Sequence, residues 1–63
     1  MPLLRRIERF LRTSGISPTR FGREAVRDPK FVADLRAGRH PRAATVRRVI
    51  AYVEAREQMD NGR

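Results

Sequence analysis

The chain has no cysteine and no tryptophan, and it has one histidine among its 63 residues. Without cysteine there can be neither a disulfide nor a thiolate metal site. The one histidine, His40, cannot supply the three or four ligands of a typical zinc site. We therefore expect no metal and no cofactor.

Long apolar segments are also missing, because no run approaches the ~20 residues that a membrane-spanning helix needs. The first residues, Met1 to Arg6, lack the apolar stretch of a signal peptide. No Ser-His-Asp set and no glycine-rich phosphate loop can be recognised. We expect a soluble, cytoplasmic protein that is not an enzyme and does not bind membranes.

Positive charge is abundant. Fifteen lysine and arginine residues stand against seven acidic ones, which leaves a net charge of +8, and Lys30 is the only lysine. In so small a domain this potential attracts polyanions, and arginine suits bidentate contacts with phosphate and guanine. A GC-rich genome would explain the preference for arginine, but not the net charge. The basic residues are spread from Arg5 to Arg63, which favours a folded basic surface over a basic tail.

The hydrophobic pattern predicts helices only. Between Leu3 and Leu11 the apolar residues recur at helical spacing, and no segment alternates as a strand does. We predict an all-α fold, a small bundle of four helices at about 2–13, 18–26, 29–37 and 42–57. Residues 1–58 would form one domain, with 59–63 as a flexible tail.

Local signals mark the ends of these helices. Ser17 and Asp28 are both good capping residues, and each is followed by a proline at the first helical position. Ser14-Gly15 ends the first helix, and Gly38 supplies the left-handed residue that ends the third.

The apolar faces of the four helices define a predicted core. Gly22 costs about 1 kcal/mol inside a helix and is expected where another helix passes too close for a side chain. The expected core residues are Leu4, Ile7, Leu11, Ile16, Phe21, Ala25, Val32, Leu35, Val46, Val49 and Val53.

Two short helices joined by a tight turn form a helix-turn-helix, and the surrounding motifs resemble the lambda-repressor-like (XRE/Cro-type) DNA-binding domains. The resemblance covers about Leu4 to Val53, and its elements come in the family's order. They are Gly15-Ile16-Ser17 before the second helix, Phe21-Gly22 within it, Val32 and Leu35 at inward positions, Gly38 and Pro41 at the exit, and Thr45-Val46-Arg47-Arg48-Val49 opening the last helix.

The turn between the second and third helices departs from the family pattern. The place where the family usually has a left-handed glycine falls on Val26, a β-branched residue that resists positive φ. The next place is usually apolar, and here it is Arg27. In one interpretation Val26 takes the buried role and the turn shifts by one residue, so the register of residues 27–30 stays open.

The resemblance implies that the helix at 29–37 enters the major groove of DNA. It places Lys30, Phe31, Ala33 and Asp34 at base edges, with Pro29 beside them. Each has an alternative. Lys30 could be only solvated, Phe31 could belong to the core, and Asp34 could pair with Lys30 or repel wrong sites.

The resemblance also implies phosphate contacts from the start of the second helix and from the loop after the third. Free N–H groups at a helix start favour an anion, and the loop 39–42 would follow the DNA backbone. The alternative for each basic residue is a solvated surface charge. The expected phosphate-contacting residues are Ser17, Thr19, Arg20, Arg23, Arg39, His40 and Arg42.

The expected function is sequence-specific binding of double-stranded DNA by a small transcriptional regulator of bacterial or phage type, located at the nucleoid. A homodimer through the fourth helix would use Tyr52 and Met59. A second hypothesis is a protein-interaction module, such as an antitoxin or a polymerase-recruiting factor, and a general nucleic-acid binder comes third. An acidic protein partner would meet the arginines of the first helix, which are Arg5, Arg6, Arg9 and Arg12.

Overall fold

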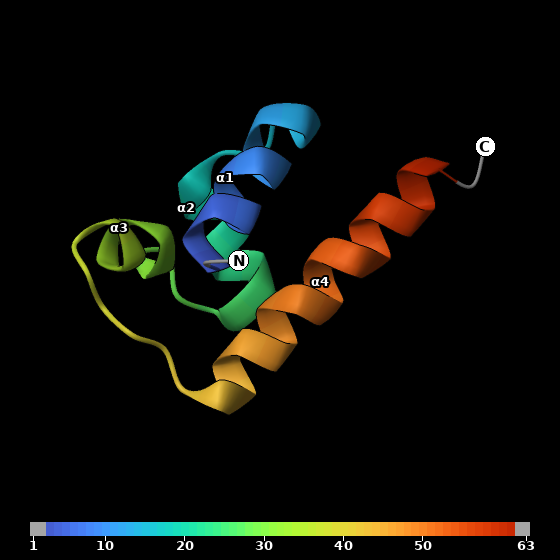
Figure 1. Ribbon diagram of the computed structural model, residues 1–63. Coiled ribbons are helices and arrows are strands. Elements are labelled where there is room, and N and C mark those ends of the chain that lie inside the picture. Colours follow the sequence, from blue (N-terminus) through green and yellow to red (C-terminus); the bar gives the residue numbers. More distant parts are fainter. Residues whose placement is uncertain (1–2, 62–63) are drawn as a thin grey trace.

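The computed structural model describes residues 3–61 and contains no strand in that range. Four helices make up the fold: α1 (Leu3–Ser14), α2 (Pro18–Val26), α3 (Phe31–Arg36) and α4 (Ala43–Asn61). The first three helices lie together on one side of α4, and the C-terminal end of α4 projects beyond them (Figure 1). The predicted all-helical class is thereby confirmed. The expected tail residues Gly62 and Arg63, and Pro2 at the expected start of the first helix, lie outside the described residues.

The second helix begins and ends where the sequence indicates. The Ser17 side chain accepts a hydrogen bond from the Arg20 N–H at 3.1 Å, which satisfies one of the free donors of the first turn. The helix ends at Val26, and the next residue, Arg27, is left-handed with φ 59°. Val26 is partly buried against the core. The left-handed residue of this turn is therefore Arg27, one position after Val26, and Val26 packs against the core.

The third helix begins two residues later than predicted. The Asp28 carboxylate accepts from the Lys30 N–H at 3.0 Å, and the Asp28 carbonyl accepts from the Phe31 N–H at 3.0 Å. These bonds close a turn with Pro29 at its second position, where proline is favoured. Asp28 thus closes a turn that precedes α3, and the first helical bond runs from Asp34 N–H to the Lys30 carbonyl.

The end of α3 follows the prediction. Gly38 is left-handed with φ 102°. Its N–H donates to the Leu35 carbonyl, and the Arg39 N–H donates to the Asp34 carbonyl, both at 3.0 Å. This pair of bonds is the Schellman arrangement, which satisfies the last carbonyls of a helix.

Gly22 lies where the chain passes closest to α2. A Cβ atom there would collide with the Asp28 carbonyl oxygen and would lie 3.2 Å from Cβ of Phe31. The Asp28 N–H also donates to the Gly22 carbonyl at 3.0 Å. The glycine is therefore required by the connection to α3, as the sequence suggested for a close approach.

The core differs from the predicted set at four positions. Phe10 and Phe31 are buried although they were not in that set, whereas Leu4 and Val46 are only half-buried. The ring centroids of Phe10 and Phe21 lie 5.7 Å apart, and Tyr52 meets Phe21 edge-on at 5.4 Å. The two rings of α1 and α2 therefore pack together under the α4 tyrosine.

The fourth helix is longer than expected. It continues to Asn61 instead of ending near residue 57, because Glu54 to Gln58 are good helix formers and no glycine follows before Gly62. Among residues 3–61, no helix is long and apolar enough to span a bilayer.

Candidate nucleic-acid interface

The residues expected at base edges divide into an exposed group and a buried one. Lys30 and Ala33 are exposed at the start and on the outer side of α3, and Asp34 is half-buried beside them. Phe31 retains only 3% of its surface and belongs to the core. A side chain so deeply buried offers no surface to a thymine methyl group, so the structure corrects the assignment of Phe31 as a base-contacting residue and supports its alternative role in the core.

Asp34 has a partner that its sequence neighbourhood did not suggest. Its Oδ2 accepts from Nη1 of Arg39 at 2.8 Å, and Lys30 is not its partner. The same Nη1 lies 3.8 Å from Oδ2 of Asp28. The expected base reader and the expected phosphate contact are therefore joined to each other, with the turn residue Asp28 beside them.

The start of α2 presents the other expected phosphate group. Ser17, Thr19, Arg20 and Arg23 are all exposed. The oxygen of Ser17 is occupied as a helix cap, but its hydroxyl hydrogen can still be donated. Arg23 has no ion-pair partner among the described side chains, which leaves its guanidinium available to an anion.

Arg20 is tied down by a short chain of hydrogen bonds. Its Nε donates to Oε2 of Glu24 at 2.7 Å, and the Tyr52 hydroxyl donates to Oε1 of the same carboxylate at 2.6 Å. The hydrogen bonds from Tyr52 and then Arg20 lower the pKa of Glu24. Burial and the bond to Glu24 raise the pKa of the Tyr52 phenol. These hydrogen bonds link α2 to α4, and Tyr52, one of the two residues expected at a dimer contact, is half-buried.

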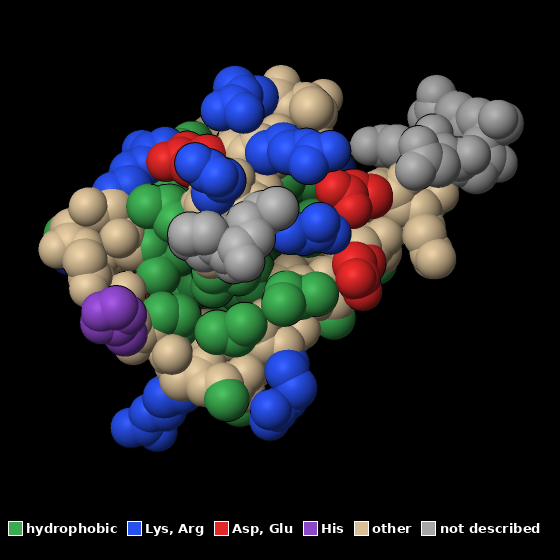
Figure 2. Space-filling view, in the orientation of Figure 1, with side chains coloured by type: hydrophobic (Ala, Val, Ile, Leu, Met, Phe, Trp, Pro, Cys, Tyr) green, Lys and Arg blue, Asp and Glu red, His purple; other side chains and the backbone are tan. Residues whose placement is uncertain are grey.

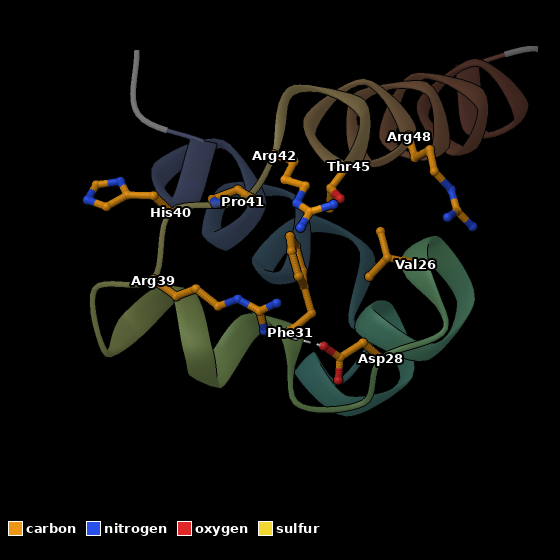
Figure 3. Close-up of a pocket in the computed structure, with 9 residues that line it drawn as sticks. All are labelled: Val26, Asp28, Phe31, Arg39, His40, Pro41, Arg42, Thr45 and Arg48. Carbon is orange, nitrogen blue, oxygen red and sulfur yellow. Dashed lines mark ion pairs between the residues drawn. The ribbon is translucent and has the colours of Figure 1, made fainter.

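A hollow of about 390 Å³ opens between the α2–α3 turn, the loop after α3 and the start of α4 (Figure 3). Arg39 crosses toward Asp28, whereas His40 and Arg48 point away from the hollow on opposite sides. Arg42 also lines it and is exposed. Arg39, Arg42 and Arg48 therefore bring positive charge to the rim of the hollow, and Asp28 contributes one carboxylate. Arg48 was not among the residues expected to contact phosphate. Its position in the first turns of the fourth helix, close to the loop, could have indicated it from the sequence.

The arginines of α1 fall into two groups. Arg6 pairs with Glu57 of α4 at 3.3 Å. Arg5, Arg9 and Arg12 are exposed and recur at i, i+4 and i+7, on the side opposite Ile7. We call these three residues the α1 ridge. None of the three forms an ion pair with a described acidic side chain.

Glu8 ties α1 to α3. Arg36 donates to its two oxygens at 2.8 and 2.7 Å, and this bond lowers the pKa of Glu8. Arg12 lies four residues beyond Glu8 in the same helix, a spacing that allows an ion pair. Glu8 instead forms this bidentate contact with Arg36 of another helix.

A second, mainly apolar hollow lies between the same loop and the start of α1, and Arg39, His40 and Pro41 line both hollows. It measures about 360 Å³ and is bordered by Leu3, Leu4, Leu35 and Pro41. Figure 2 shows hydrophobic side chains gathered on the face where α1, the loop and α4 meet, with basic side chains around them. Met59, near the end of α4, is 70% exposed.

The described residues thus present exposed lysine and arginine side chains around α3, the start of α2 and the loop. Comparison with protein-family models, with curated proteins and with solved structures found no match to this chain.

Proposed function

We propose that this chain is a helix-turn-helix regulator, of the lambda-repressor-like kind, that binds double-stranded DNA sequence-specifically. The observation that carries the proposal is the exposed start of α3, with Lys30 and Ala33 outward, between two basic segments. In the chain, the exposed arginines of α2 precede it and those of the loop follow it. This arrangement suits a short helix that enters a groove while its neighbours meet phosphates.

The connection between α2 and α3 supports a fixed angle between the two helices. Gly22 allows the turn to pass close to α2, and the Asp28 N–H donates to the Gly22 carbonyl. Phe31 anchors the start of α3 in the core. A recognition helix needs such anchoring because base contacts require defined geometry. Lys30 would then donate to guanine O6 or N7, the commonest specific contact of a basic side chain.

A homodimer would supply the affinity that one such module lacks. Two copies on a two-fold operator would place half-sites about 34 Å apart. The projecting end of α4, with Met59 exposed, is the contact we propose for this pairing. Repression and activation are both compatible with this arrangement.

The test is binding of the purified chain to fragments selected from a random DNA pool, followed by fluorescence anisotropy at several salt concentrations. About five phosphate contacts per subunit predict a log–log slope of roughly −4.5 per subunit. Arg23→Ala should weaken binding to all sequences alike, whereas Lys30→Ala should change the preferred sequence. An unchanged preference in Lys30→Ala would overturn the assignment of α3, and a flat salt response would overturn DNA binding itself.

The α1 ridge favours a second candidate, binding of an acidic protein segment. Its three side chains are exposed on the side of α1 opposite Ile7, and none of them lines the hollow beside α3. Replacing all three residues by glutamine tests this, with Arg23→Ala and Arg42→Ala as comparison. If the ridge serves a protein, the triple variant keeps DNA affinity close to that of the wild type and loses binding to a glutamate-rich peptide. An equal loss of DNA affinity would instead assign the ridge to DNA.

A further inference from the structure

We infer that Asp34 determines specificity through an exchange of partners with Arg39, an inference that rests on the DNA binding proposed above. In the free protein each of the two residues neutralises the other. On a correct site, Arg39 leaves for a backbone phosphate and Asp34 accepts from a cytosine amino group. On a site without that cytosine the exchange does not take place.

The geometry places the two residues in one unit. The side chains meet at 2.8 Å, and the backbone N–H of Arg39 also donates to the carbonyl of Asp34 at 3.0 Å. The second bond belongs to the end of α3 and holds the two residues together whatever their side chains do. The guanidinium can therefore change partners without any change in the fold of α3.

The ion pair is open enough to be exchanged. The side chains of Arg39 and Asp34 are 58% and 37% exposed, and pairs at this exposure are weak because water and salt compete for both charges. A phosphate offers a guanidinium the same paired oxygens as a carboxylate does. Asp28 is the weaker partner of Arg39, because its Oδ2 lies 3.8 Å from the same Nη1, beyond hydrogen-bond distance (Figure 3).

The exchange distinguishes one base from another, because the Asp34 carboxylate faces a base edge once Arg39 has moved to a phosphate. In the major groove cytosine presents an amino donor, whereas guanine and thymine present acceptors to the same region. A released carboxylate facing acceptors is unpaired and repelled. On such a site the Arg39–Asp34 pair is more stable formed than separated. Arg39 then stays with Asp34, and the protein makes one phosphate contact fewer.

The salt dependence of binding measures this difference directly. Wild-type protein should show a log–log slope steeper by about 0.9 per subunit on the selected target than on the same DNA with that cytosine replaced by thymine, which presents an acceptor. Asp34→Asn should bring both slopes to the steeper value, because asparagine carries no charge to pair with Arg39 and Asp28 lies beyond hydrogen-bond distance of it. Its affinity for the replaced DNA should rise on the order of tenfold, the scale of one charge-assisted contact.

Two further variants complete the experiment. Arg39→Gln should bring both slopes to the shallower value, and in that background Asp34→Asn should no longer tighten binding to the replaced DNA. Glu54→Gln on exposed α4 removes the same charge without freeing an arginine, and it should leave both slopes unchanged. Circular dichroism melts establish that each variant is folded.

Three outcomes would overturn the inference while leaving DNA binding intact. One is equal wild-type slopes on the two DNAs. Another is an Asp34→Asn variant that binds both DNAs more weakly, as expected if Asp34 only supports the fold. The last is tightening by Asp34→Asn that persists without Arg39, which would be simple charge repulsion. A wild-type protein that shows no salt-dependent binding at all would instead contradict the proposed function.

Discussion

The starts of α2 and α3 carry the same sequence signal and fold differently. At each, a capping residue precedes a proline: Ser17 before Pro18, and Asp28 before Pro29. The Ser17 carbonyl accepts from the N–H four residues on, that of Phe21, at 2.9 Å, so the helix begins at once. The Asp28 carbonyl accepts from the N–H three residues on, so a turn forms first.

The difference lies in what comes before the signal. Ser17 follows a short loop that begins at the left-handed Gly15, and its own backbone is extended, with φ −70° and ψ 152°. Asp28 follows the left-handed Arg27 directly, and its N–H is bound to Gly22 of the preceding helix. A cap and a proline therefore mark a place where a helix can begin, but the preceding backbone decides whether it begins there.

The largest effect in this comparison should come from Gly22→Ala. Alanine favours a helix by about 1 kcal/mol, yet its methyl group would collide with the Asp28 carbonyl, and overpacking of this kind costs about 1–3 kcal/mol. We expect net destabilisation in urea unfolding. Thr19→Ala, at an exposed position of the same helix, should stay within about 0.5 kcal/mol. A Gly22→Ala variant more stable than wild type would show that the turn does not pass there.

Replacing Ser17 or Asp28 should have the next largest effect on stability. Ser17→Ala should cost about 1 kcal/mol and speed hydrogen exchange at the Arg20 amide. Asp28→Ala should act on the Lys30 amide instead, while Asp28→Asn, which keeps the accepting oxygen, should preserve its protection. Exchange followed by NMR measures these amides separately. Fast exchange at Lys30 in the asparagine variant would contradict the turn described here.

Arg27 allows the strain in the turn to be measured. A left-handed residue with a Cβ costs about 1–2 kcal/mol relative to the ordinary helical region, and glycine escapes this cost. Arg27→Gly should therefore be more stable than Arg27→Ala by about 1 kcal/mol, although both remove the same charge. Thermal unfolding of the two variants side by side gives the difference, and equal stabilities would argue against a left-handed conformation at this position.

Lowering the pH should have the smallest effect on stability. It tests two hydrogen-bonded carboxylates, Glu8 between α1 and α3 and Glu24 between α2 and α4. The pKa values of Glu8, bonded to α3, and Glu24, bonded to Tyr52, are lowered from the usual 4.5. Each therefore contributes stability that is present above about pH 4.5 and is lost as the pH falls through its lower folded value. Urea midpoints measured from pH 6 to pH 3 should fall less in Glu8→Gln and Glu24→Gln than in wild type. Glu54→Gln should follow the wild-type curve.

Much of this fold could be read from neighbouring residues. The bounds of α2, the Ser17 cap, the left-handed Gly38 and nine of the eleven predicted core positions agree with the structure. Each depends on spacing within one helix or on the conformations that one residue permits. Such preferences act over a few consecutive residues, so the sequence alone is enough to predict them.

The tertiary structure decided the rest, above all at the candidate interface. The i+4 rule pairs Glu8 with Arg12 and Lys30 with Asp34, yet Arg36 and Arg39 take these carboxylates. An exposed pair within one helix is worth only a few tenths of a kcal/mol, so a better placed arginine from another segment can replace it. Phe31 is likewise drawn into the core by the packing of α3 on α2. The composition of the chain determined a basic helical protein, and its packing decided which of the basic residues remain free to bind an anion.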